Sequence, residues 1–127
     1  MSVIIYNNIK NTVLKNKNYR KVVYTEDGKI QMVFMCITID DKDIPWEIHS
    51  EVTQMIRVES GEGMASFKDD NNELHHVYLN KNSFIIIKNN TEHRIMNISK
   101  TKDLLITSIY SPPEHPKNRI DKRKPIK

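Results

Sequence analysis

The stretch EIHSEVTQMIRVESGEG, residues 47–63, combines the alternation of a β-strand with side chains that can bind a metal ion. Glu47 and His49 are two residues apart, so on a strand both side chains project from one face. In the apolar run that follows, Gln54 shares its face with Ile56. Burying carboxylate and imidazole groups on an inward face costs free energy unless something binds them. The stretch therefore indicates either a polar cluster inside a barrel or ordinary residues on the outer surface of a sheet.

The rest of the chain reads almost entirely as β-strands. Short runs rich in Val, Ile, Tyr and Phe recur along it, separated by turn-forming clusters such as EDG and KDDNN. The clearest runs are 21–26, 31–39, 64–69, 75–80, 83–88, 93–99 and 104–110. Residues 7–16 could form a helical turn or two, and Pro112 ends the sheet because proline cannot donate to a ladder. Many short strands with no helix between them predict an all-β antiparallel sandwich or barrel.

The length of 127 residues suits one domain with a core of its own. Cys36 is the single cysteine, so neither a disulfide framework nor a cysteine zinc site can form within one chain, and a packed core thiol is expected. The apolar run at the N-terminus is too short for a signal peptide, and no stretch approaches membrane-spanning length. These features predict a cytoplasmic protein that does not associate with a membrane.

Positive charge is concentrated at the C-terminal end. The chain carries a formal net charge of +4, but residues 117–127 hold six Lys or Arg against one Asp, so residues 1–116 carry a net charge of −1. No basic and aromatic residues interleave as they do in nucleic-acid-binding motifs, and nucleic acid is not an expected partner. The pattern predicts one domain over residues 1–116 and a flexible basic tail over residues 117–127.

Residues 47–63 resemble the first motif of the cupin superfamily, G-x5-H-x-H-x(3,4)-E-x6-G. Glu47 stands at the first His of that motif, His49 at the second His, Gln54 at the Glu and Gly61 at the closing Gly. The resemblance implies a cupin-type double-stranded β-helix, also called a jelly-roll barrel. It also implies that the polar residues of the stretch point into the barrel.

A second cupin motif, G-x5-P-x-G-x2-H-x3-N, is matched by His93 and Asn97. Asn82, Lys88 and Asn90 stand where that motif has Gly, Pro and Gly. Asn tolerates the left-handed backbone conformation that a glycine position often needs, so the turn before His93 can survive. Asn97 is expected to act as a structural hydrogen-bonding residue.

The resemblance extends over residues 18–118 and is closest to small single-domain cupins of the mannose-6-phosphate-isomerase-like subgroup. Cupins of this kind hold manganese, iron, nickel or zinc through three His and one Glu, so the implied ligands here are Glu47, His49, Gln54 and His93. The carboxylate has moved from the third position to the first, which leaves the ligand charge at −1 with neutral imidazoles. A site without metal, in which the same groups bind an organic ligand through hydrogen bonds, is the alternative.

The function implied by the resemblance is a metal-dependent reaction on a small polar substrate, either a sugar derivative or an oxygenated acid. Isomerase, lyase or dioxygenase chemistry would fit, with Glu47 as the catalytic base. The alternative is a non-catalytic small-molecule-binding module or a barrel whose site has decayed. The resemblance to small cupins also implies a homodimer.

Other polar residues are expected to play structural or surface roles. His75 and His76 are adjacent, so on a regular strand they point to opposite faces and cannot bind one ion together. His115 is expected at the surface. Arg57 points away from Gln54, which predicts a pair with a carboxylate outside the barrel interior.

Overall fold

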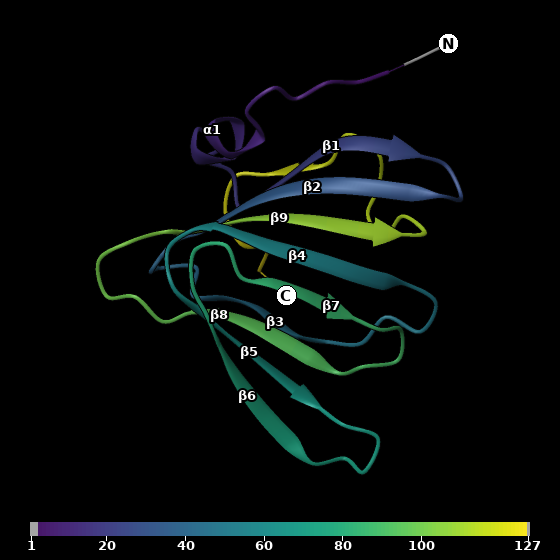
Figure 1. Ribbon diagram of the computed structural model, residues 1–127, viewed down its shortest axis with the longest axis vertical. Coiled ribbons are helices and arrows are strands. Elements are labelled where there is room, and N and C mark those ends of the chain that lie inside the picture. Colours follow the sequence, from purple (N-terminus) through teal and green to yellow (C-terminus); the bar gives the residue numbers. More distant parts are fainter. Residues whose placement is uncertain (1–2, 127) are drawn as a thin grey trace.

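The computed structural model describes residues 3–126, which form two antiparallel β-sheets and one short helix (Figure 1). The elements are α1 (Ile9–Leu14), β1 (Arg20–Glu26), β2 (Ile30–Ile37), β3 (Asp43–Glu47), β4 (Thr53–Ser60), β5 (Gly63–Lys68), β6 (Leu74–Leu79), β7 (Phe84–Ile87), β8 (His93–Asn97), β9 (Leu104–Ser111) and β10 (Ile120–Asp121). The larger sheet has the order β10-β1-β2-β9-β4-β7, and the smaller has the order β3-β8-β5-β6. The prediction of an all-β antiparallel fold is confirmed.

The core lies between the inner faces of the two sheets and follows the alternation of the sequence. Ile56 and Val58 of β4 are fully buried, whereas Arg57 between them is exposed and pairs with Glu59, 3.3 Å from Nε to Oε1. The predicted pairing of Arg57 outside the barrel interior is thereby confirmed. The same alternation buries the inner residues of the other strands, which are Val22, Val33, Met35, Ile37, Ile44, Ala65, Leu79, Ile87, Ile95, Leu104, Ile106 and Tyr110.

Helix α1 covers part of the outer face of the larger sheet. Asn8 caps the helix, its side-chain oxygen accepting a hydrogen bond from the backbone N–H of Asn11 at 3.3 Å. Val13 is fully buried in a second apolar cluster that includes Phe34 and Cys36. Burial, with the nearby Asp103 adding to it, raises the pKa of the Cys36 thiol to about 12. Cys36 is therefore the packed core thiol that the sequence predicts.

The loop that follows β8 is held by the side chain of Asn97. Its amide nitrogen donates to the backbone carbonyls of Ile37 and Lys102, both at 2.9 Å. Its amide oxygen accepts from the backbone N–H of Ser99, also at 2.9 Å. Asn97 is thus a structural hydrogen-bonding residue, as predicted, and it ties the loop between the sheets to the end of β2.

The C-terminal segment lies against the barrel. Strand β10 pairs with β1, and Asp121 lies 2.5 Å from Arg20. Further along, Arg123 forms an ion pair with the buried carboxylate of Asp41 at 3.0 Å. These contacts fix where the segment lies, while the predicted flexibility of residues 117–127 stays a prediction.

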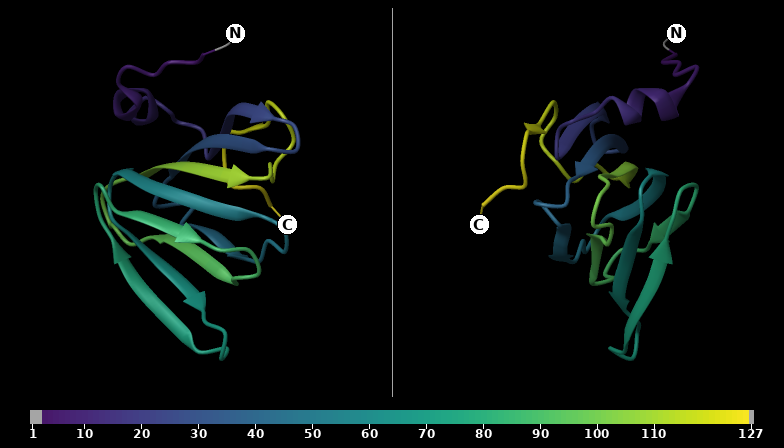
Figure 2. Two further views of the ribbon diagram at one scale, coloured as in Figure 1. Left: turned by 45° about the vertical axis from the view of Figure 1, so that its right-hand side comes forward. Right: turned by 90° about the vertical axis from the view of Figure 1, so that its left-hand side faces the viewer.

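Strands β6 and β7 end their respective sheets. Strand β6 pairs with β5 and β7 pairs with β4, and together they flank an opening between the two sheets. The β5–β6 hairpin extends beyond the rest of the barrel (Figure 2). None of the described residues form a helix with the length and apolar character that crossing a membrane requires.

Candidate metal centre

Paired strands β3 and β8 carry the centre of the candidate site. Glu47, the last residue of β3, lies directly opposite His93, the first residue of β8. Between Ile44 and Glu47 the register shifts by an extra residue on β3. Ile44 and Glu47 are three residues apart, so in a regular strand their side chains would point to opposite faces. The extra residue forms a bulge that lets both side chains point inward. Trp46 is correspondingly exposed on the outer side.

Three side chains converge inside the barrel. Oε1 of Glu47 lies 3.2 Å from Nε2 of His49 and 3.6 Å from Nε2 of His93. The two imidazole rings are 5.3 Å apart between centroids and tilted by 54°. Each residue offers one ligand atom, and these atoms lie within 4.8 Å of one another. The three residues form a buried His/Glu triad that could hold a metal ion.

The hydrogen bond that His93 makes on one side of its ring leaves a lone pair on the other side, facing Glu47. Nδ1 of His93 lies 2.8 Å from the carbonyl oxygen of Thr91, and because a carbonyl can only accept, Nδ1 carries the proton. In the neutral ring Nε2 is then an acceptor. This atom is buried and has no hydrogen-bond partner among residues 3–126. A buried lone pair without a hydrogen-bond partner costs free energy. A metal ion that accepted this lone pair from Nε2 would remove the cost.

His49 is oriented by a second carboxylate, which the sequence analysis missed. Nδ1 of His49 lies 3.2 Å from Oε1 of Glu114, while Nε2 faces Glu47. Nε2 of His49 is hydrogen-bonded to the Glu47 carboxylate, which only accepts, so this nitrogen carries a proton that a metal ion would have to displace. Glu114 lies close enough to Nδ1 to orient the ring, as carboxylates do for metal-ligating imidazoles. Glu114 lies 65 positions after His49, in the segment PPEHP, and no local spacing signals the contact.

The fully buried Gln31 of β2 holds Glu114 in place. Its amide oxygen accepts from the backbone N–H groups of Glu114 and His115, at 3.2 and 2.9 Å, and its amide nitrogen donates to the carbonyl of His115 at 2.8 Å. The ring of His115 packs edge-on against Tyr110. Burial, together with the charges of Arg20 and Arg119, lowers the pKa of His115 to about 4. The expectation that His115 lies at the surface is met only in part, because His115 is half-buried against Tyr110 while Glu114 and Pro116 on either side of it are exposed.

The charges in the triad favour a cation. Burial opposes ionisation of Glu47, but its hydrogen bond with the His49 imidazole outweighs this and holds the pKa of the carboxyl below its usual range. Hydrogen bonding to Glu47 raises the pKa of His49 despite the opposing effect of burial, and the charges of Glu47 and Glu114 add to the rise. Both groups therefore stabilise positive charge at this point, which a divalent ion would supply.

Gln54 lies on β4, in the sheet opposite Glu47 and His93. Its amide nitrogen donates to the hydroxyl of Tyr110 at 3.1 Å and to Oγ of Ser108 at 3.3 Å. The amide oxygen is buried and has no hydrogen-bond partner among the described residues. An amide oxygen in this state can coordinate a hard ion or hold a water bound to it. The role of Gln54 as a fourth ligand stays a prediction.

The turn of the second motif keeps its shape without glycine. Asn90 adopts the left-handed conformation with φ 65°, as the sequence analysis anticipated. Its backbone N–H donates to the carbonyl of His49 at 2.8 Å. Asn90 therefore replaces the glycine of the cupin motif without loss of the turn before β8, and the turn is hydrogen-bonded to the backbone of His49.

A second group of side chains, Asp69, Glu73 and His75, also brings potential ligand atoms within 4.8 Å of one another. The hydrogen bonds of the β5–β6 turn account for this grouping, because the carboxylate of Asp69 accepts hydrogen bonds from the backbone N–H groups of Asn71 and Glu73. The group is largely exposed to solvent. It serves below as a control for the buried triad.

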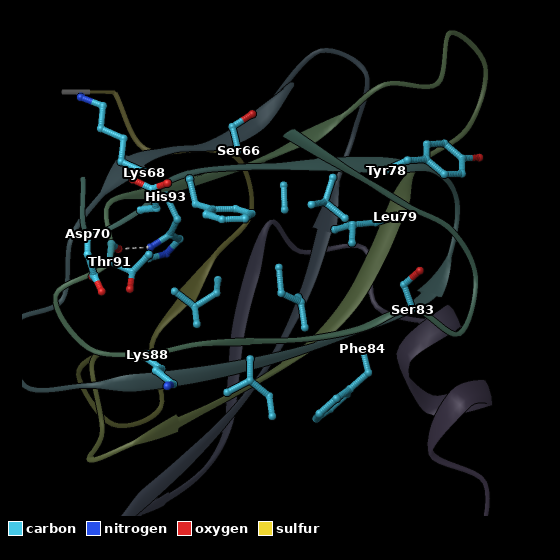
Figure 3. Close-up of a pocket in the computed structure, with 17 residues that line it drawn as sticks. Ser66, Lys68, Asp70, Tyr78, Leu79, Ser83, Phe84, Lys88, Thr91 and His93 are labelled. Carbon is cyan, nitrogen blue, oxygen red and sulfur yellow. Dashed lines mark hydrogen bonds between the residues drawn. The ribbon is translucent and has the colours of Figure 1, made fainter. Parts of the chain in front are cut away.

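A cavity of ≈ 640 Å³ opens between β5, β6 and β7 and reaches the triad at His93 (Figure 3). Apolar side chains make up the middle of its wall. The lining residues are Ala65, Ser66, Phe67, Lys68, Asp69, Asp70, Val77, Tyr78, Leu79, Ser83, Phe84, Ile85, Ile86, Ile87, Lys88, Thr91 and His93. A small molecule in this cavity would contact His93, the one residue of the triad that lines it.

Comparison with sequences of known proteins finds relatives over most of the chain. No known family model matches. The uncharacterized protein L612 of Acanthamoeba polyphaga mimivirus is 38% identical over 118 residues, which cover 93% of this chain and 71% of L612. The uncharacterized protein YrkC of Bacillus subtilis is 35% identical over 121 residues, covering 92% of this chain and 62% of YrkC. The chain thus spans about two thirds of the length of these relatives.

Comparison with solved structures identifies the fold. The crystal structure of BH2720 from Bacillus halodurans has a TM-score of 0.85 and 28% identity, covering 95% of this chain and 89% of that protein. The cupin domain of Schizosaccharomyces pombe Cnp3 has a TM-score of 0.65 and 10% identity, covering 74% and 60%. A cupin-2 domain protein of Shewanella frigidimarina has a TM-score of 0.61 and 18% identity, covering 86% and 95%. The two sheets described above are those of a cupin jelly roll.

Proposed function

The chain belongs to the same family as the mimivirus protein L612 and has a cupin fold, and from this premise we propose that it binds a divalent metal ion inside the barrel and acts there on a small molecule. The observation that carries the proposal is the Nε2 atom of His93. It is buried, points its lone pair at Glu47 and finds no partner among residues 3–126. An ion held between His93, His49 and Glu47 would satisfy it.

The residues divide into ligands and supporting groups. Glu47, His49 and His93 would hold the ion, with the amide oxygen of Gln54 as the fourth ligand, and Glu114 would orient His49. This mixed nitrogen and oxygen set suits manganese, iron, nickel or zinc. When bound, such an ion polarises a carbonyl or hydroxyl oxygen of a substrate.

Glu47 is proposed as the general base. Its side chain is 30% exposed, more than that of either histidine, so a proton of a bound substrate can reach it. Its lowered pKa keeps it ionised, and so able to accept a proton, at neutral pH, but also makes it a weaker base than an ordinary carboxylate. Proton transfer beside a polarised oxygen serves isomerase or lyase chemistry on a sugar derivative or an oxygenated acid, and iron in the same site would serve a dioxygenase.

A binding module without turnover is the second candidate. The observation that favours it is the amide of Gln54 at the position where the cupin motif has a carboxylate, since an amide cannot act as a base. The two candidates differ in one measurement. An enzyme forms product from a bound ligand in the presence of the ion, whereas a binding module is stabilised against heat by the ligand and releases it unchanged.

The metal proposal is tested by elemental mass spectrometry on untagged protein. After separate incubation with manganese, iron, nickel and zinc and removal of free ions, we expect about one ion per chain for at least one metal, because one triad offers one site. Protein that retains none of the four metals would overturn the proposal. The search would then turn to an organic ligand that bonds directly to Glu47 and His49.

We also propose a homodimer, formed through the outer face of the larger sheet. The strand registers align one apolar side chain from each of five neighbouring strands in a row across that face, namely Ile86, Met55, Ile109, Met32 and Tyr24. Beside the row, Tyr6 and Ile30 are 37% and 40% exposed and border a hollow of ≈ 470 Å³. An apolar face of this extent is typical of an interface, and a second copy of the chain would cover it.

The expected solution mass is twice the 15.0 kDa of the chain. Light scattering after size exclusion measures it directly. A Met55→Glu substitution places a charge in the middle of the apolar row and is expected to give the monomer, since an unpaired charge is costly to bury. A wild-type protein with the mass of one chain at micromolar concentration would contradict the proposal.

A cytoplasmic location is proposed from the cysteine alone. Cys36 is buried and has no second cysteine to pair with, which suits a reducing compartment. Immunofluorescence or fractionation of the cells that make the protein would locate it. Recovery from a secreted fraction would contradict the proposal.

A further inference from the structure

We propose that the cavity beside the triad binds a carboxylic acid with an apolar body, either aromatic or aliphatic. The inference rests on the proposed metal centre and narrows its substrate class. The carboxylate would lie at the His93 end, and the apolar body would lie between β6 and β7. Three features of the cavity carry the inference, namely its exposed apolar wall, the charge at one end and its size.

The wall of the cavity contains apolar side chains that face inward and yet remain open to solvent. Val77 of β6 pairs with Ala65 of β5, and directly paired residues project from the same face of a sheet. Ala65 is 1% exposed in the core, so Val77 also points inward, although it is 43% exposed. Phe67 of β5 and Ile85 of β7 line the same space. An apolar ligand would cover this surface, and its binding would be stabilised by the apolar area removed from water.

The two ends of the cavity differ in character (Figure 3). His93 and Thr91 lie at one end, whereas Tyr78 and Phe84 lie at the other, with apolar side chains between them. A ligand that fills the space therefore has one end at His93, the triad residue that lines the cavity, and its body along the apolar wall. Such a ligand is amphiphilic, and a uniformly polar molecule does not match the lining.

The charge at the triad selects the chemistry of the polar end. A divalent ion with Glu47 as its anionic ligand and two neutral imidazoles keeps a net charge of +1, which one carboxylate neutralises. The lysines of the lining, Lys68 and Lys88, are balanced by Asp69 and Asp70, and Lys68 is also paired with Glu92 at 3.3 Å. The attraction for an anion would thus come from the metal centre and not from the wall.

The volume of the cavity fits a body of this kind, and its apolar wall disfavours a sugar. Small-molecule sites span about 300–1,000 Å³, and this cavity has ≈ 640 Å³. Sugar hydroxyls placed against Ile85 and Phe67 would lose their hydrogen bonds to water, and each hydroxyl left unpaired weakens binding. The cavity therefore favours the oxygenated acid over the sugar derivative among the substrates considered above.

Three probes separate the parts of the proposal. They are 3-phenylpropanoate, gluconate, which has the same charge on a polar body, and 3-phenylpropan-1-ol, which has the same body without the charge. Calorimetry on the metal-loaded protein is expected to give 3-phenylpropanoate at least about tenfold tighter binding than gluconate. Removing the ion with a chelator should weaken the acid about tenfold and leave the alcohol unchanged. Gluconate binding as tightly as 3-phenylpropanoate, or no binding of any probe, would overturn the inference.

Two substitutions on β6 provide a matched pair. Val77→Thr keeps the side-chain shape on the cavity face, whereas Leu74→Thr alters the same strand outside the cavity lining. We expect Val77→Thr to weaken 3-phenylpropanoate about threefold or more, because a hydroxyl replaces an apolar contact, and Leu74→Thr to have no effect. Equal effects of the two would overturn the inference. Metal content is measured on both, so a failure of the metal proposal, in which wild-type and variant proteins hold no ion, is distinguished from a failure of the ligand class.

Discussion

The His93→Ala variant is expected to lose its metal ion, with an affinity roughly 100-fold or more below that of the wild type. His93 is 1% exposed, its Nδ1 is committed to the carbonyl of Thr91, and its Nε2 faces Glu47 without a hydrogen-bond partner among residues 3–126. Alanine removes the one ligand atom that strand β8 gives to the triad. The remaining Glu47 and His49, with the weaker amide oxygen of Gln54 as the other proposed ligand, would hold a divalent ion less tightly. Elemental analysis and competition with a metal-chelating dye measure the change.

His75→Ala is the matched control, because His75 belongs to the second carboxylate and histidine group of the chain. His75 is exposed, and its contact with Asp69, 2.7 Å from Nε2 to Oδ2, belongs to a surface turn. We expect this variant to retain the ion at wild-type stoichiometry. The reverse pattern, in which His93→Ala keeps the ion and His75→Ala loses it, would place the metal at the β5–β6 turn and sink the proposal for the buried triad.

The convergence of the triad could be predicted from the sequence because the signals that carry it are local. The spacing of Glu47 and His49 predicts one face of a strand, and His93 follows from the second motif, although β3 ends at Glu47 and His49 lies in the loop after it. The bulge between Ile44 and Glu47 could not be predicted, since a register shift depends on the partner strand. The bulge nevertheless decides which face Glu47 uses. The expectation that Glu47 points into the barrel was correct because it came from the cupin motif, which places this residue inward whatever the register before it.

The contacts that support the triad were missed because they join distant parts of the chain. Glu114 reaches His49 only because the buried Gln31 fixes the backbone of the segment after β9. The half-buried position of His115 depends on the same hydrogen bonds from Gln31. A buried Gln in a strand carries no pattern that names its partner 83 positions away. The proline-rich segment after β9 does lie at the surface, and tertiary pairing of this kind decides which of its side chains reach the site.

The fold was predictable for a different reason. Alternation of apolar residues identifies the inner face of each strand, and Ile56 and Val58 are buried as that alternation requires. The position of the C-terminal segment was not predictable, because its ion pair between Arg123 and Asp41 spans most of the chain. The prediction of a basic tail over residues 117–127 rested on composition alone.

Gly61→Ala is expected to lower the free energy of unfolding by about 3 kcal/mol or more, which corresponds to a Tm lower by roughly 10 °C. Gly61 lies between β4 and β5 with φ +95°, a backbone conformation that residues with a Cβ rarely adopt. A Cβ built there would overlap the carbonyl oxygen of Asp103 and come within 3.0 Å of Cα of Leu104. Both obstacles are backbone atoms at the start of β9, so no side-chain rotation relieves the overlap.

Gly28→Ala separates the two causes of that loss. Gly28 also has a positive φ, +70°, but a Cβ at that position would have no atom within 4 Å. Only the backbone term applies, so a loss of about 1 kcal/mol is expected. Thermal and urea unfolding of both variants beside the wild type measure the difference of about 2 kcal/mol, which is the contribution of the close approach between the β4–β5 turn and the start of β9. Equal losses for the two glycines would mean that backbone conformation alone, and not this packing, explains the glycine that closes the first motif.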